Sequence, residues 1–242
     1  MAPLSERSTI VAAAILAIGF VITGWLAANA FYETRALSNV ISVTGSATAT
    51  TTADSATWTL TVTRSATEGQ LPSVQSNVSS DAQQVVNFFS TAGIAAADIQ
   101  ITPLSIDRDY SKDQNAPTTY NVHEDISVQS DDPSLIDRLS KGTGALLAKG
   151  ILVSAQPPQY FISDLPRLRV SLIGQAVTDA KARATQIAKS TDQQVGALQS
   201  ASSGVVQVMT PNSVDVSDYG SYDTSTIKKQ VMITVHATFL LK

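Results

Sequence analysis

The stretch Ser55-Ala56-Thr57-Trp58-Thr59-Leu60-Thr61-Val62-Thr63-Arg64 decides the fold class of this chain. Its apolar side chains alternate with threonines, and this period of two places the two sets on opposite faces of a β-strand. The β-branched threonines suit the polar face because their side chains pack well on a pleated surface. The preceding segment Val40–Thr52 also has the composition of a strand, and Ala53-Asp54-Ser55 has that of a turn. We therefore expect Val40–Thr52 and Ala56–Arg64 to pair as an antiparallel hairpin.

Outside this stretch, segments with helical spacing alternate with further strands. Each expected helix has an apolar stripe at intervals of three and four residues; the helices run from Pro72 to Gly93, from Asp132-Pro133 to Gly150, and from Ser163-Asp164 to Ala188. Strands are expected at Ile99–Ile106, Tyr120–Val128, Ile151–Val153, Tyr160–Ile162, Val195–Val208 and Ile227–Leu241. The resulting order, ββαββ followed by αβαββ, predicts an α+β fold in which helices pack on a largely antiparallel sheet.

The N-terminal residues have the composition of a membrane-spanning helix. No charged residue occurs from Ser8 to Tyr32, and a bilayer core needs about 20 apolar residues in a helix. We therefore expect a cytoplasmic tail at residues 1–7, a single transmembrane anchor at residues 8–32, and an exported domain at residues 36–242 in the periplasm or extracellular space. The alternative is a signal peptide cleaved after Ala30, although the apolar run exceeds the roughly 7–15 residues usual for such a peptide.

The composition excludes several classes of function. The chain has no cysteine, which excludes disulfides, thiolate-bound metals and a cysteine nucleophile. Its formal net charge of −4 argues against nucleic acid as a partner. Because only two histidines occur, a site with several histidine ligands is not expected. The sequence therefore predicts neither a cofactor nor a metal, and we assign no catalytic, cofactor-binding or metal-binding residue.

Two polar segments are nevertheless the candidates for a site. In His123-Glu124-Asp125 the first two side chains lie on opposite faces of the expected strand, so they cannot act together without residues from elsewhere. The loop Asp215–Asp223 offers many oxygen ligands, but it lacks the spacing and the closing glutamate of a calcium loop. The other histidine, His236, is expected to be packed or half-exposed in its strand. These residue types therefore indicate at most a weak ligand site.

The remaining charged and glycine motifs have structural interpretations. Asp107-Arg108-Asp109 and Asp131-Asp132 have the pattern of strand-end and helix-cap charges. Gly142-x-Gly144 lacks the context of a nucleotide-binding loop. Three cationic residues are expected on a solvated helix face: Lys181, Arg183 and Lys189.

Several motifs occur in a defined order along Val40–Leu241. They are Ile41-Ser42-Val43-Thr44-Gly45, Ala53-Asp54-Ser55-Ala56, Gly93-Ile94 followed by Asp98-Ile99 and Tyr110, the helix Ala176–Ala188, and Tyr219-Gly220-Ser221-Tyr222-Asp223 before the strand Ile227–Leu241. Together they resemble the SIMPL-domain family of exported bacterial proteins, which includes oxidative-stress-defence and periplasmic immunogenic types. Ala53 stands where the family often has proline, which affects the stiffness of that turn rather than the fold.

The resemblance implies an α+β domain outside the cytoplasm, a tendency to form ring- or channel-like homo-oligomers, and a role of some members in envelope or oxidative stress. The family has no agreed catalytic residues, so the resemblance transfers none. We therefore expect a membrane-anchored, non-enzymatic SIMPL-type protein that self-assembles into a ring- or cage-like homo-oligomer. The alternative is an extracytoplasmic sensor that binds a ligand or metal through His123–Asp125 and Asp215–Asp223. An exported hydrolase, in which a serine pairs with a histidine, is the third hypothesis.

Overall fold

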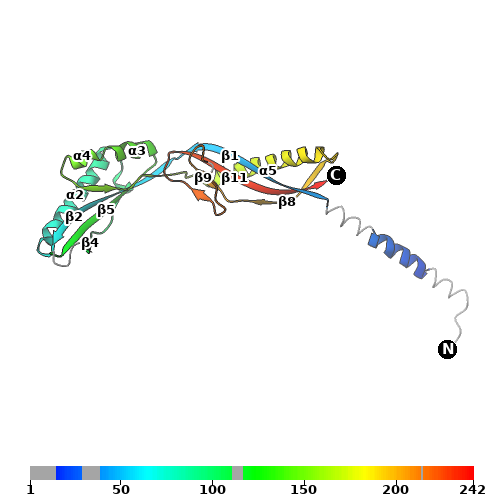
Figure 1. The fold of residues 1–242 in the computed structure, drawn as a ribbon, viewed down its shortest axis with the longest axis horizontal. Coiled ribbons are helices and arrows are strands. Elements are labelled where there is room, and N and C mark those ends of the chain that lie inside the picture. The colour runs from blue at the N-terminus through cyan, green and yellow to red at the C-terminus, as the bar shows by residue number, and fades with distance from the viewer. Residues whose placement is uncertain (1–14, 29–38, 111–116, 214) are drawn as a thin grey trace, which may run out of the picture. The chain divides into compact units, whose positions relative to one another are not determined.

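The computed structural model describes residues 15–28, 39–110, 117–213 and 215–242, and these form an α+β fold (Figure 1). Their strands make two sheets that are largely antiparallel. One sheet has the order β1-β11-β9-β10, with β8 also paired to β11. The other has the order β3-β5-β2-β6, with β4 paired to β5 and β7 paired to β2. The predicted α+β class is therefore confirmed.

The elements follow the predicted order, although several expected strands are divided into shorter ones. The strands are β1 (Val40–Thr52), β2 (Ser55–Thr67), β3 (Ile99–Ile101), β4 (Ser105–Asp109), β5 (Thr119–Ser130), β6 (Val153–Ala155), β7 (Gln159–Phe161), β8 (Val195–Ser203), β9 (Gln207–Met209), β10 (Ser221–Tyr222) and β11 (Lys228–Leu241). The α-helices that follow β2 are α2 (Leu71–Thr91), α3 (Pro133–Lys141), α4 (Gly144–Leu147) and α5 (Leu165–Lys189). Pro103 divides the expected strand Ile99–Ile106 into β3 and β4, and the expected strand Val195–Val208 is divided into β8 and β9. Pro157-Pro158 lies between β6 and β7, which were expected as separate strands.

The predicted hairpin of β1 and β2 is wrong, because the two strands belong to different sheets. β2 pairs with β5 from Ala56 to Thr67 on one side, and with β6 and β7 on the other. Both of its edges are therefore occupied by other strands, and β1 lies beside β11 instead. The alternating pattern correctly predicted which side chains face a core, but it does not specify which strand lies next to which.

The described residues divide into two compact units, of which the second comprises Thr48–Leu172 and Val205–Met232. Its core lies between the apolar face of β2 and β5 and the helices that pack on it (Figure 1). Trp58 of β2 is buried there and meets the ring of Phe89 of α2 edge-on, with 5.7 Å between the ring centroids. The threonines predicted for the polar face of β2 do lie opposite this core.

The helix signals near this core are largely confirmed. α2 ends before Gly93, whose φ of +97° is a conformation that favours glycine. Asp132 is the N-cap of α3 and accepts hydrogen bonds from the backbone N–H groups of Ser134 and Leu135. The single helix expected from Asp132-Pro133 to Gly150 is wrong, because Gly142 ends α3 and a short α4 follows. The glycines of Gly142-x-Gly144 therefore mark a helix break.

The first unit comprises residues up to Ala47, Ile173–Gly204 and Ile233–Lys242. The predicted apolar stripe of α5 is buried at its alanines, whereas Ile187, which the stripe also included, is 50% exposed; the buried alanines are Ala176, Ala180, Ala184 and Ala188. Small side chains let the helix backbone approach β1 closely at Gly45, where a Cβ atom would lie 2.5 Å from the Ala180 nitrogen. Beside this contact the carboxylate of Asp179 accepts a hydrogen bond of 2.8 Å from the Ser46 backbone N–H. Glycine at position 45 is therefore a steric requirement of the helix–sheet packing.

Part of the predicted N-terminal anchor lies outside the described residues. Residues 15–28 are helical, whereas residues 8–14 and 29–32 are not among those described, and neither is the proposed cleavage point at Ala30. Within the described part of the chain, no helix combines the length and the apolar character needed to cross a membrane.

Replacing Gly45 with alanine should strongly destabilise the first unit. The added methyl group would overlap the Ala176 carbonyl oxygen and the α5 backbone, and overpacking of this kind costs about 1–3 kcal/mol or more. Gly174→Ala is the matched control, because a Cβ there meets no atom within 4 Å and alanine favours a helix by up to about 1 kcal/mol. Urea unfolding of both variants measures the change. Equal stability of Gly45→Ala and the unmodified chain would contradict the close contact.

Candidate functional site

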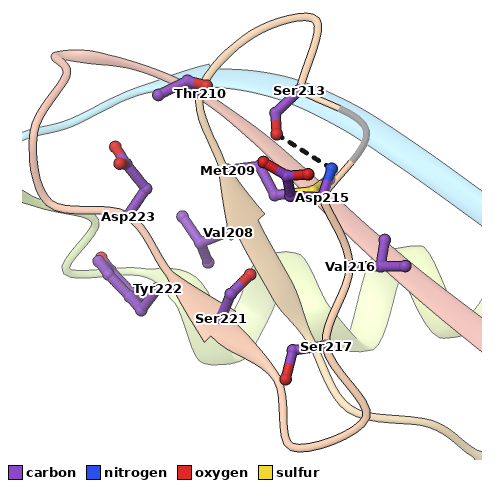
Figure 2. Close-up of a pocket in the computed structure, with 10 residues that line it drawn as sticks. All are labelled: Val208, Met209, Thr210, Ser213, Asp215, Val216, Ser217, Ser221, Tyr222 and Asp223. Atoms are coloured by element: carbon purple, nitrogen blue, oxygen red, sulfur yellow. Dashed lines mark hydrogen bonds between the residues drawn. The ribbon is translucent and has the colours of Figure 1, made fainter.

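The loop between β9 and β10 forms a pocket together with these two short strands (Figure 2). The pocket has a volume of about 380 Å³, which is in the size range of small-ligand sites. Hydroxyl and carboxylate groups dominate its polar lining; they belong to Thr210, Ser213, Asp215, Ser217, Ser221, Tyr222 and Asp223. The loop predicted from the oxygen-rich segment Asp215–Asp223 is therefore the segment that lines this pocket.

A buried glutamine holds the loop in place. The side chain of Gln207, at the start of β9, is 5% exposed. Its Nε2 donates to the backbone oxygen of Ser217 at 2.5 Å, and its Oε1 accepts from the Ser221 hydroxyl at 2.8 Å. Parallel pairing of β9 with β10 adds a second constraint on the same residues. The loop is thus fixed at two points by one amide side chain, whose nitrogen and oxygen both take part.

Asp223, which lines the pocket, forms an ion pair with a buried lysine. Lys229 of β11 is fully buried, and its Nζ donates to the backbone oxygen of Asp223 and lies 3.3 Å from Asp223 Oδ1. Burial lowers the pKa of Lys229, and the hydrogen bond to Asp223 only partly offsets this effect. Burial acts to raise the pKa of Asp223, but hydrogen bonds from Ser225 and Lys229 outweigh it and bring the pKa below its ordinary value. The contact between the two side chains therefore links β11 to the loop that ends at Asp223.

The segment His123-Glu124-Asp125 behaves as its alternation predicts. Glu124 is buried and accepts a hydrogen bond of 3.0 Å from the Ser79 hydroxyl of α2. His123 lies on the other face of β5, where its Nδ1 is 3.6 Å from Asp107 Oδ2. Asp125 accepts a hydrogen bond from Thr61 at 2.6 Å. The structure therefore joins His123 to Asp107, a pair that depends on the β4–β5 register and that the sequence did not reveal.

The prediction that His236 is packed or half-exposed is wrong, because its position on β11 is exposed. Its ring shares a hydrogen bond of 3.1 Å with the Thr44 hydroxyl. Arg108 lies over the ring of Tyr110, with 5.4 Å between its guanidinium carbon and the ring centroid. The three cationic residues predicted to lie on a solvated helix face are exposed on α5, and Arg183 forms an ion pair with Asp179; these three are Lys181, Arg183 and Lys189.

The polar groups that line the pocket are hydroxyls and carboxylates, which can form hydrogen bonds with a ligand. Among the described residues, no group of three histidine or acidic side chains lies close enough to hold a metal ion. None of the residues that line the pocket belongs to His123–Asp125, so the two segments proposed for a sensor do not form one site there.

The sequence analysis did not identify the two residues that hold this loop, Lys229 and Gln207. The hydrophobic alternation of β11 could have indicated the first of them. Lys229 occupies an inward position of the alternation that continues through Val231 and Ile233, so its burial could have been expected. Gln207 comes directly after Val205 and Val206, and no hydrophobic pattern in the sequence indicates that its side chain is buried.

Comparison with known protein families gives a match. The family model SIMPL, described as a protein of unknown function (DUF541), matches residues 41–239. The resemblance found in the sequence motifs is therefore confirmed over nearly the whole described fold. No curated protein matches the chain.

Asp223→Asn should destabilise the protein more than Lys229→Met. The first change leaves a buried ammonium group without its charged partner, which costs roughly 1–3 kcal/mol or more. The second replaces that ammonium by an apolar side chain of similar length, so no buried charge remains. Urea unfolding measures both, with Asp137→Asn as the control because it breaks the more exposed Asp137–Lys141 pair. A greater loss for Lys229→Met would show that the charge pair is not what holds Asp223.

Proposed function

The chain belongs to the SIMPL family, and from this premise we propose that it is a non-enzymatic, exported protein that self-assembles at the membrane. In this proposal residues 8–32 anchor each copy, and the SIMPL domain lies in the periplasm or extracellular space. A ring- or cage-like homo-oligomer is the assembled form, and a role in envelope or oxidative stress is proposed with it. Anchoring favours assembly because it raises the local concentration of the domains.

One observation carries the proposal, namely the open edge of β8. No strand among the described residues pairs with the edge of β8 that faces away from β11. The strand is exposed from Ala197 to Ser203, and no charged residue occurs between Gln193 and Ser213. Proteins usually protect such edges with charges or bulges, because an open edge pairs readily with another strand. An uncharged open edge is therefore a surface on which a second copy can dock.

Other sheet edges of this chain carry the protection that β8 lacks. On the edge strand β4, the charged run is Asp107-Arg108-Asp109. On the edge strand β1, the Ser46 N–H is occupied by the Asp179 carboxylate. β8 has two irregularities of register, one on each side of Leu198, and these leave Ser200–Ser203 regularly paired to β11. The contrast favours Ser200–Ser203 as the part of the edge that pairs with another chain.

The register of β8 indicates which backbone groups are available. The Gly204 N–H donates to the Thr234 oxygen, and the pairs from Ser203–Val235 to Ser200–Thr238 continue this register. Because bonded and non-bonded pairs alternate in an antiparallel ladder, the N–H and C=O groups of Ala201 and Ser203 point away from β11. These two residues therefore present the groups with which a new strand would pair.

The occupant we propose is β8 of a second copy, related by a two-fold axis at Ser202. An axis perpendicular to the strands places Ala201 of each copy opposite Ser203 of the other, so that each outward N–H meets an outward C=O. An axis parallel to the strands would place N–H opposite N–H, and such an arrangement cannot pair. Because neither segment is charged, the two edges meet without repulsion. The resulting pair is the first contact of the assembly, and a ring or cage requires another.

A second candidate function is the extracytoplasmic sensor, and the pocket lined by the Asp215–Asp223 loop favours it. Its ligand would bind to the hydroxyl and carboxylate groups of that loop. Elemental analysis together with thermal shift in calcium and zinc separates the two proposals, because a ligand that binds only the folded state raises the melting temperature.

Light scattering on the full-length chain should show an oligomer that Ser202→Lys weakens or abolishes. The substitution places two lysines opposite each other across the axis, where like charges are destabilising. Ser105→Lys is the control, because it adds the same charge to the exposed, already charged strand β4. Ser202→Cys supplies an independent readout: the chain has no other cysteine, and a non-bonded antiparallel pair has a Cα separation of about 4.5 Å, which a disulfide can span.

Two outcomes would contradict this proposal. A strictly monomeric chain at high concentration would remove the assembly. An oligomer that neither responds to Ser202→Lys nor crosslinks through Ser202→Cys would place the contact elsewhere than β8.

A further inference from the structure

A second, separate pocket lies within the second unit, beside the first turns of α5. It has a volume of about 410 Å³, in the range of small-ligand sites. Its lining is apolar apart from one guanidinium group and one phenol; the residues are Leu165, Pro166, Arg169, Val205, Val206 and Tyr219. We call it the Tyr219 pocket. Its chemistry differs from that of the hydroxyl-rich pocket in Figure 2.

The wall that carries Tyr219 is fixed although the side chain itself is not packed. Tyr219 is 97% exposed, which is unusual for a large aromatic residue. The next residue, Gly220, has a φ of +85°, and its N–H donates to the Ser217 oxygen at 3.0 Å. A Cβ at Gly220 would lie 3.1 Å from the Val206 oxygen, so glycine permits the close approach of this turn to Val205-Val206.

Buried Gln207 holds the same turn from the other side. It forms hydrogen bonds with Ser217 and Ser221, which lie two residues before and two residues after Tyr219. The backbone of an exposed aromatic residue is therefore held by a buried amide and by a glycine in a left-handed conformation. Because the backbone of this turn is held in place, binding a ligand against Tyr219 requires the ordering of its side chain alone, which lowers the entropy cost of binding.

The guanidinium group of Arg169 in this pocket forms no ion pair among the described residues, whereas several other arginines do. Arg167, two residues earlier on α5, forms an ion pair with Asp164. Arg64 and Arg183 are paired with Asp81 and Asp179. Among the ion pairs of the described residues, none includes Arg169, which is exposed and lines the pocket. An unpaired guanidinium at an apolar pocket is complementary to an anion attached to an apolar body.

We propose that the Tyr219 pocket binds a small hydrophobic carboxylic acid. The apolar body lies against Leu165 and Val206 beside the Tyr219 ring, and Arg169 binds the carboxylate. A planar guanidinium suits a carboxylate because it offers two parallel N–H donors. A single cation favours one negative charge over a polyphosphate. This proposal goes beyond self-assembly, and its residues are separate from the β8 edge.

The probe for this proposal is 3-phenylpropionate, compared with the uncharged 3-phenylpropanol. Calorimetric titration of the full-length chain should show that the acid binds about tenfold more tightly than the alcohol, because a hydrogen bond to a charged group is worth about this factor. Arg169→Gln should remove the difference between the two probes. Arg167→Gln is the matched control, because Arg167 lies two residues earlier on the same helix. It should keep the difference in affinity between the acid and the alcohol. Tyr219→Ala should weaken both probes to a similar extent.

Each contrary result identifies a separate error. No binding of the acid at millimolar concentration, equal affinity for acid and alcohol, or an unchanged preference in Arg169→Gln would overturn the proposal. Tighter binding of acetyl-Ala-Phe than of the free acid would assign the pocket to peptide chain ends instead and would overturn the choice of a small molecule. Arg169 is exposed, so an unchanged melting temperature of Arg169→Gln confirms that a loss of binding is not a loss of folding.

Discussion

The two residues between β1 and β2 determine how the chain is distributed between its sheets. The Ala53 N–H donates to the Ile227 oxygen at 2.8 Å, and the Asp54 N–H donates to the Phe161 oxygen at 3.0 Å. The carboxylate of Asp54 accepts from the N–H and the hydroxyl of Ser163. Burial acts to raise the pKa of Asp54, but these bonds from Ser163 outweigh it and the pKa lies below its ordinary value. The segment therefore bonds to β7 and to the residues preceding β11 and α5 instead of closing a hairpin.

This junction has consequences for both candidate binding surfaces. It leaves β2 free to pair on both sides, and it fixes Ser163 immediately before α5, the helix whose first turns supply Leu165, Pro166 and Arg169. The buried polar side chains elsewhere serve the fold, since every buried side-chain nitrogen or oxygen of the described residues has a hydrogen-bond partner. What remains for recognition is exposed: an uncharged strand edge in the first unit and an aromatic pocket in the second. The two proposals therefore concern different residues, and each can be tested without the other.

The sequence predicts where the helices and strands lie better than it predicts which strands pair with each other. Alternation predicted the buried face of β2 and the inward side chains of β11, and the cap at Asp132 predicted the start of α3, because these are local properties. The pairing of β1 was wrong because its pattern is equally compatible with β2 and β11 as partners. The His123–Asp107 contact and the role of Gln207 depend on register and loop packing, which distant segments determine. Sequence analysis thus found the loop that forms the site but not the contacts that hold it.

Membership of the SIMPL family fixes the fold and leaves location and assembly as the claims to test. The chain contains no cysteine, so Gln129→Cys, at an exposed position of β5, provides a single reporter thiol. Whole cells are treated with a maleimide that cannot cross the cytoplasmic membrane and are then separated into membrane and soluble fractions. The account predicts a labelled full-length chain in the membrane fraction. A thiol that reacts only after lysis, in a chain found in the soluble fraction, would contradict an exported and tethered protein.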